Sequence, residues 1–122
     1  MHLALSNNKK FWNNSVKNIY LGPWMMPDIL KDNFSEYDFI IPDWHWDNLD
    51  KFYSDSLKIL NDYEKLIIKL AEVLNELHDL NWSLKAWKIL IGPWFKRYLG
   101  IIYERNETIN ILYNSYNLRS CA

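Results

Sequence analysis

The feature that most constrains the fold is a long amphipathic stretch between Lys51 and Asp79. Apolar residues recur there at alternating steps of three and four, with mostly charged residues between them, a pattern typical of an α-helix that buries one side. The predicted apolar stripe comprises Leu60, Tyr63, Ile67, Leu70, Leu74 and Leu77, widened by Ile59, Leu66, Val73 and Leu80. Asn48 or Asp50 is the expected N-cap, and the helix should fray around residues 79–81.

The length of this stretch suggests that it belongs to a larger protein. A straight helix over residues 51–79 would be about 43 Å long at about 1.5 Å per residue. A compact chain of 122 residues has a diameter of only about 35 Å. Either the helix breaks, at residues 54–56 or near 61–62, or it is part of a larger body. We favour the second, and therefore expect the protein to continue beyond residue 122.

Composition excludes several classes of protein. With 49% apolar and 24% charged residues, the chain resembles one folded domain rather than a disordered segment. The formal net charge of -1 gives no overall attraction to nucleic acid or to an anionic membrane. Cys121 is the single cysteine, which excludes an internal disulfide and fits a reducing compartment. No apolar run approaches the roughly 20 residues of a membrane span, so we expect no membrane-spanning segment. From the charge and the single cysteine we expect a cytoplasmic protein with no nucleic-acid partner.

The region before the long helix is predicted to hold one or two short strands. Residues 17–21 form a β-rich apolar run that a Gly-Pro pair halts, which indicates a buried strand entering a turn. Residues 22–50 hold most of the prolines and should be loop, with one helical turn near residues 28–33. Residues 39–41 fit a second strand, which the following proline limits to a sheet edge or to its own end.

The region after the long helix is predicted to hold several shorter helices. Ser83 is a good N-cap for a helix over residues 84–91. Gly92 and Pro93 should kink or break it, with Pro93 starting a new helix that is apolar on all sides and therefore buried. Asn106 is the expected cap of a last helix. The core or a buried interface should hold Trp82, Trp87 and Trp94.

The Gly-Pro-Trp triplet after the first strand is the first candidate for a functional site. Gly22 follows the buried strand, and in α/β folds the ligand crevice opens at the carboxyl ends of the strands, where a missing Cβ lets a ligand approach. The same residue fits a tight turn, which the local sequence favours. The triplet recurs at residues 92–94 in a different context. No Gly-x-Gly-x-x-Gly or Walker loop is present, so a phosphate cradle is not indicated.

The second candidate is a polar and aromatic cluster just before the long helix. His45 and Asp47 can form an acid/base pair, and Trp44 and Trp46 offer indole faces that stack on sugar rings. The alternative is a helix N-terminus, with Asp47 among the possible caps and the tryptophans serving only in packing. His78 fits the C-terminal end of the helix dipole better than a zinc site, so we expect no bound metal.

Three segments together resemble a known family. Residues 18–24, 44–48 and 74–94 are similar to the amino-terminal region of a family of transferases associated with O-antigen and bacterial surface-polysaccharide biosynthesis. The resemblance covers most of the chain from Asn18 onward, and members of the family are several times longer. It implies a helix-dominated α/β protein, the amino-terminal fragment of a Rossmann-like domain of the glycosyltransferase kind, with one or two short parallel strands and about four helices.

The predicted elements divide the chain into three regions, and the resemblance implies roles for five residues. Residues 1–16 are a lead-in, residues 17–50 form the strand and loop region, and residues 51–118 form the helical region of one partial domain. The implied catalytic pair is His45 and Asp47. The implied substrate-binding residues, which match the strand-to-loop motif and the His-Trp-Asp motif of the family, are Gly22, Trp24 and Trp46.

The sequence departs from the family pattern at two places. Asn48 stands where the family usually has a second acid, and Lys85 and Ala86 replace an Arg-Tyr pair, which removes a rigid donor fork and an aromatic ring.

The expected function is that of an amino-terminal transferase segment, inactive alone. It would hold no cofactor, and its partners would be a sugar or glycan-precursor substrate and the remainder of the longer enzyme. An activated, nucleotide-linked donor would bind largely to that remainder. The alternative is a stand-alone helical protein-interaction module.

Overall fold

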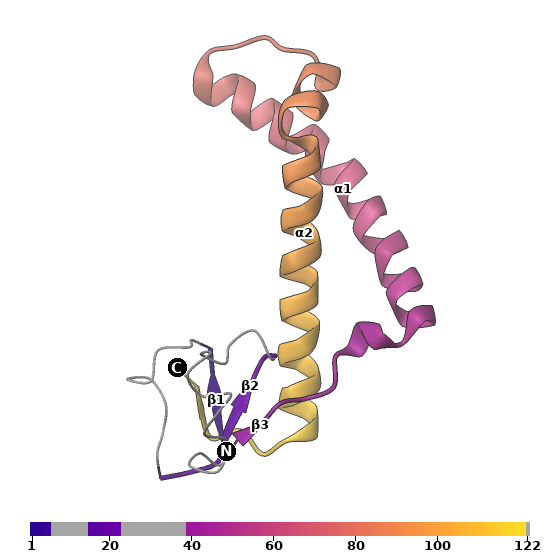
Figure 1. Cartoon of the computed structure of the whole chain (residues 1–122). Coiled ribbons are helices and arrows are strands. Elements are labelled where there is room, and N and C mark those ends of the chain that lie inside the picture. The colour runs from indigo at the N-terminus through magenta and orange to yellow at the C-terminus, as the bar shows by residue number, and fades with distance from the viewer. Residues whose placement is uncertain (6–14, 23–38, 122) are drawn as a thin grey trace, which may run out of the picture. The chain divides into compact units, whose positions relative to one another are not determined.

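The computed structural model describes residues 1–5, 15–22 and 39–121. It is dominated by two long helices and a small sheet (Figure 1). The chain divides into two compact units, the first formed by residues 1–47 and 105–122 and the second by residues 48–104. The helical turn expected near residues 28–33 lies outside the described residues.

The first unit contains a four-stranded parallel sheet. Its strands are β1 (His2–Ala4), β2 (Asn18–Tyr20), β3 (Phe39–Ile40) and β4 (Ser120–Cys121), in the order β3-β2-β1-β4. Strand β2 confirms the buried strand expected at 17–21, and β3 confirms the edge strand expected at 39–41. The sheet has four strands instead of one or two, because β1 and β4 contain no β-branched or aromatic residue that would indicate a strand.

The core of the first unit is apolar and joins the sheet to helix α2 (Leu84–Ser115). Its buried members are Leu3, Ala4, Ile19, Tyr20, Leu21 and Leu112. Hydrogen bonds connect residues 1–2 with residues 117–120 here. The Met1 carbonyl oxygen accepts a hydrogen bond from Arg119 N at 3.0 Å, and the Met1 amino group donates to the Asn117 carbonyl at 3.1 Å. The His2 ring Nδ1 lies 2.8 Å from Ser120 Oγ.

In the second unit, helix α1 (Leu49–His78) confirms the long predicted helix and is unbroken at residues 54–56 and 61–62. Asn48 is its N-cap, with Oδ1 accepting from Lys51 N at 3.1 Å. Asp79 ends the helix with a left-handed backbone, φ 52°. Both ends therefore lie where the sequence pattern predicts them, because capping depends on residues that are close in sequence.

The buried face of α1 is narrower than the predicted stripe. The residues that are buried along it follow one another at steps of four, and they are Asp55, Ile59, Tyr63, Ile67 and Ala71. Leu60, Leu66, Val73 and Leu77 of the predicted stripe are exposed. The difference arises because α1 packs against a single helix in this unit, which covers only a narrow strip of its surface.

Helix α2 contradicts the predicted breaks. Ser83 caps its start as expected, with Oγ accepting from Ala86 N at 3.2 Å, but the helix then runs through Pro93 and Asn106 to Ser115. A proline inside a helix removes one backbone hydrogen bond. Here the turns on either side of Pro93 stay helical, and Gly92 packs directly against Tyr63 of α1.

The part of α2 after Pro93 is also less buried than expected. This part was predicted to be buried because it is apolar on all sides, yet Trp94 is 61% exposed and Tyr98, Ile101 and Ile102 are exposed as well. Of the three tryptophans expected in a core or interface, Trp87 is buried and Trp82 and Trp94 are exposed. No helix in the described part of the chain is both long and apolar enough to cross a membrane.

Polar side chains join α1 to α2. Asn75 Oδ1 accepts from Trp82 N at 3.0 Å and from the Trp87 indole Nε1 at 2.9 Å, while its Nδ2 donates to the Trp82 carbonyl at 2.9 Å. Further along the helices, Lys88 Nζ donates to Glu64 Oε2 at 2.6 Å, and this hydrogen bond raises the pKa of Lys88 above its ordinary value. These contacts hold the two helices together near the end of α1 and at its middle.

Candidate functional site

The candidate site residues follow neighbouring strands of the sheet. Gly22 comes two residues after β2, and the short 3-10 turn η5 (His45–Asp47) comes shortly after β3. Strands β2 and β3 are parallel neighbours, with Ile19 paired to Ile40. Because the carboxyl ends of parallel strands meet at one edge of a sheet, both segments leave the sheet at the same edge. Trp24 lies outside the described residues.

The turn η5 places an aromatic ring beside His45. The turn is closed by a hydrogen bond from Asp47 N to the Trp44 carbonyl, 3.0 Å long. The ring centroids of His45 and Trp46 are 5.3 Å apart, and those of Trp44 and Trp46 are 5.8 Å apart with an edge-on arrangement. Trp44 is exposed and Trp46 is half-buried. One indole ring thus lies beside the imidazole, and a second, solvent-exposed indole packs edge-on against the first.

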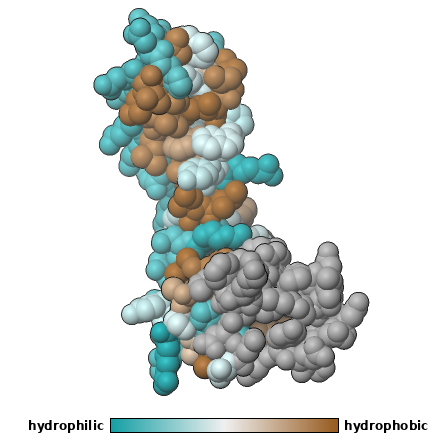
Figure 2. All heavy atoms as spheres, turned by 90° about the vertical axis from the view of Figure 1, so that its left-hand side faces the viewer, coloured by the Kyte–Doolittle hydropathy of each residue, from teal (hydrophilic) through white to brown (hydrophobic). Residues whose placement is uncertain are grey.

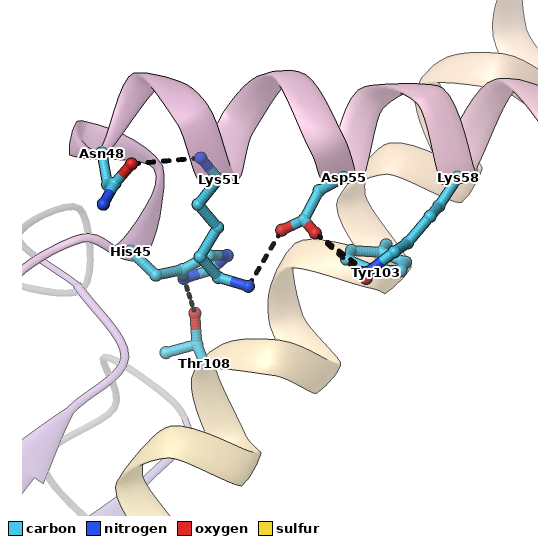
Figure 3. Close-up of polar contacts among 7 residues, drawn as sticks. All are labelled: His45, Asn48, Lys51, Asp55, Lys58, Tyr103 and Thr108. Atoms are coloured by element: carbon cyan, nitrogen blue, oxygen red, sulfur yellow. Dashed lines mark hydrogen bonds and ion pairs between the residues drawn. The ribbon is translucent and has the colours of Figure 1, made fainter.

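The two nitrogen atoms of the His45 ring have different surroundings. Nδ1 lies 3.4 Å from Oγ1 of Thr108 on α2 (Figure 3). Thr108 is only 6% exposed. Nε2 is buried and has no hydrogen-bond partner in the part of the chain that the structure describes. Leaving a buried polar atom unpaired costs about 1–3 kcal/mol. Such an atom needs an explanation, and a small polar group that binds beside it is one.

Thr108 is a site residue that the sequence analysis missed. It is 63 positions away from His45, and a single threonine inside a helical stretch carries no local signal of such a contact. Only the packing of the last part of α2 near the sheet brings it to the imidazole. The resemblance to the transferase family does not point to it either, because none of the three matching segments reaches residue 108.

His45 and Asp47 are not joined to each other by a hydrogen bond in the described structure. Asp47 is exposed at the end of η5, and the cap of α1 is Asn48 rather than Asp47. The helix-cap alternative therefore accounts for Asn48 but leaves the Asp47 carboxylate available to a ligand. The geometry is that of two neighbouring polar groups, with the imidazole turned toward α2 and the carboxylate toward solvent.

A second polar cluster lies in the helical unit, around the buried carboxylate of Asp55. Asp55 is 1% exposed, and its oxygens lie 3.1 Å from Lys51 Nζ, 3.7 Å from Lys58 Nζ and 3.3 Å from the Tyr103 hydroxyl (Figure 3). A buried carboxylate is tolerated only with such partners. The sequence pattern missed it, because an aspartate among the charged positions of α1 is expected to face solvent. Its partners explain its burial without a ligand.

Among the residues that the structure describes, no three His, Cys, Asp or Glu side chains are grouped closely enough to hold a metal ion. His78 ends α1, where the helix dipole favours a positive charge. Cys121 is exposed on β4.

Comparison with known proteins identifies a family. The family model for the LIC12162 family transferase matches residues 1–122. No curated protein and no solved structure matches the chain. The match includes both compact units and runs through the strands, η5 and both long helices without interruption.

Proposed function

Because the chain belongs to the LIC12162 family of transferases, we propose that it serves group transfer onto a sugar or glycan precursor in bacterial surface-polysaccharide biosynthesis, including that of O-antigen. The observation that carries the transferase class is the family match over residues 1–122. The sugar substrate is supported by the indole ring of Trp46 beside His45 and by that of Trp44 packed against it, because indole faces pack well on the apolar faces of sugar rings.

We further propose that the sheet is part of a Rossmann-like domain of the glycosyltransferase kind. All four strands are parallel, and the chain runs outward from β1 to β3 before it returns to the other side of β1 as β4. The first four strands of Rossmann-like sheets have the same order, and such sheets bind ligands beyond the carboxyl ends of their strands. This edge is the one from which Gly22 and the turn η5 emerge.

The proposed roles follow from the chemistry of each group. A hydroxyl of the acceptor gives its proton to His45, and the oxygen attacks the carbon of the donor sugar that carries the leaving phosphate. That carbon–oxygen bond breaks, and the nucleotide leaves with the bonding electrons. Asp47 hydrogen-bonds the acceptor, Trp46 and Trp24 contact its ring, and Gly22 leaves room for it. The activated donor is bound by the remainder of a longer enzyme.

We propose that the segment is inactive alone. The transferase to which it belongs is proposed to act in the cytoplasm, where activated donors are made. Group transfer needs both oriented acid/base groups and groups that stabilise the leaving phosphate. The sequence supplies the first with His45 and Asp47 but has no glycine-rich phosphate loop. The remainder of the transferase is therefore its proposed partner.

The catalytic proposal is tested by substitution in the transferase that contains these residues. His45→Ala should lower the rate of sugar transfer at least tenfold, because the proton of the acceptor loses its base. His78→Ala is the matched control, since this histidine is exposed at the end of α1, and it should leave the rate unchanged. The measurement is release of the nucleotide with a panel of sugar nucleotides. Equal rates for the two variants would show that His45 is not catalytic.

The exposed apolar surface of the helical unit favours a second candidate function, in protein interaction. Ile89 is 73% exposed, and Leu77, Leu90 and Trp94 are exposed with it. Figure 2 shows that apolar side chains, in brown, are spread over the surface of the helices. Contiguous apolar surface of this kind marks protein contacts. Because the family match includes the helical unit, the partner that we propose is the rest of the transferase, rather than an unrelated protein served by a stand-alone module.

A further inference from the structure

The unequal surroundings of the two His45 nitrogens bear on where the proton of this ring resides. A neutral imidazole carries one proton, and the nitrogen that bears it is a donor while the other is an acceptor. Nδ1 faces the Thr108 hydroxyl at 3.4 Å, and Nε2 is buried without a partner among the described residues. If Nδ1 donates its proton to the Thr108 hydroxyl, Nε2 is unprotonated and can act as a base. If the hydroxyl donates to Nδ1, Nε2 carries the ring proton and is a donor.

The position of Thr108 inside α2 favours one direction. A threonine within a helix commonly donates its hydroxyl proton to the backbone carbonyl one turn earlier. Thr108 is buried well within the bounds of α2, so this carbonyl is within its reach. A hydroxyl used in this way offers only its lone pairs to other groups. The proton of the contact must then come from Nδ1 of His45.

The burial of Nε2 favours the same direction. Buried N–H groups that lack an acceptor are rare in folded proteins. With the proton on Nδ1, the buried atom Nε2 is an unpaired acceptor. With the proton on Nε2, it would be a buried N–H that no described residue satisfies. The first state is the less costly of the two.

We propose that Thr108 is a positioning residue that holds neutral His45 with its proton on Nδ1, so that Nε2 is the atom that accepts a proton from a hydroxyl of the acceptor. The second half of this statement rests on the proposed function. When the proton moves, the O–H bond of the acceptor breaks and an N–H bond forms at Nε2. The resulting imidazolium keeps its Nδ1–H bond to Thr108 Oγ1. The Trp46 ring, 5.3 Å from the imidazole, restricts a ring flip that would exchange the nitrogens.

The tautomer can be read directly in the chain of 122 residues. Long-range proton–nitrogen NMR spectra of the ¹⁵N-histidine-labelled protein, recorded at a pH of about 8.5 where imidazoles are neutral, separate the three histidines. His45 should show a protonated Nδ1 and an unprotonated Nε2. Exposed His78 is the internal reference, because a free imidazole prefers its proton on Nε2. The His45→Asn variant assigns the signal.

Two substitutions of Thr108 isolate its hydroxyl. Thr108→Val keeps the shape of the side chain and removes the hydroxyl, and the His45 signals should move toward the pattern of His78. Thr108→Ser keeps the hydroxyl, and the Nδ1–H pattern should remain. A proton on Nε2 in the unmodified chain would overturn the proposal, and this measurement needs no variant to fold. Persistence of the Nδ1–H pattern in a folded Thr108→Val variant would overturn it as well.

The readout also separates this proposal from the proposed function. The tautomer is measured without substrate, so it is independent of whether His45 takes part in transfer. In the full transferase, Thr108→Val should lower kcat several-fold with little change in KM, and Thr108→Ser should restore it. An Nδ1–H tautomer combined with full activity of His45→Ala would remove the role of Nε2 as base. The control of the tautomer by Thr108 would stand.

Discussion

Asn75→Ala is expected to lower the free energy of unfolding of the helical unit by about 3 kcal/mol. The side chain of Asn75 makes three hydrogen bonds, two with the backbone of Trp82 and one with the indole of Trp87. Trp87 is only 4% exposed, so alanine would leave its N–H buried without an acceptor. That penalty adds to the loss of the two bonds that hold the connection between the helices.

The measurement is urea unfolding followed by tryptophan fluorescence, because the buried indole of Trp87 reports on this unit. Asn75→Asp separates the contributions, since it keeps the acceptor for Trp87 and loses the amide donor, and its effect should be intermediate. Asn81→Ala is the matched control on an exposed position of the same connection. A loss below about 1 kcal/mol for Asn75→Ala, the value of one ordinary hydrogen bond, would contradict the argument.

Gly92→Ala is expected to destabilise the protein by about 2 kcal/mol, in the range of an overpacked contact. A Cβ at this position would lie 2.6 Å from the hydroxyl oxygen of Tyr63, whose side chain is buried against α2. Gly100 lies in the same helix, and a Cβ there would meet nothing within 4 Å. Gly100→Ala should therefore stabilise the protein by up to about 1 kcal/mol, because alanine favours the helix.

The opposite signs of these two substitutions are the test, and thermal or urea unfolding measures both. The contact with Tyr63 is isolated by the double variant Tyr63→Phe with Gly92→Ala, since phenylalanine lacks the offending oxygen. It should recover most of the lost stability, with an interaction energy of about 1 kcal/mol or more in the double-mutant cycle. Stabilisation by Gly92→Ala alone would show that the helices separate easily at this point.

The parts of the fold that the sequence predicts depend on residues close together in the chain. Asn48 and Ser83 cap their helices through backbone groups three residues further on, so their roles can be inferred from local sequence. Pro93 shows the opposite case. Its local effect is to break a helix, yet α2 continues through it. Gly92, the residue before it, packs against Tyr63, and this contact cannot be inferred from the neighbouring sequence.

The same distinction applies to the sheet and to the candidate site. Gly22 is a candidate because it follows a strand that local sequence predicts, and His45 because it belongs to a polar and aromatic cluster before the long helix. The parallel pairing of β2 with β3 brings both segments to one edge. Thr108 could not be found in this way, because 63 residues separate it from His45. Strands β1 and β4 could not be predicted either, because neither contains a β-branched or aromatic residue and each is defined by its pairing with a distant segment.

The pairing of the first strand with the last has a consequence for how the protein is made. Leu3 of β1 pairs with Cys121 of β4, and 116 positions separate Met1 from its hydrogen-bond partner Asn117. Closing so long a loop is entropically costly and slow. The contacts of Asn75 with Trp82 and Trp87 are at most 12 residues apart. During synthesis on the ribosome the helical unit can fold while β1 still lacks its partner β4. The sheet is completed only once the residues of β4 have emerged.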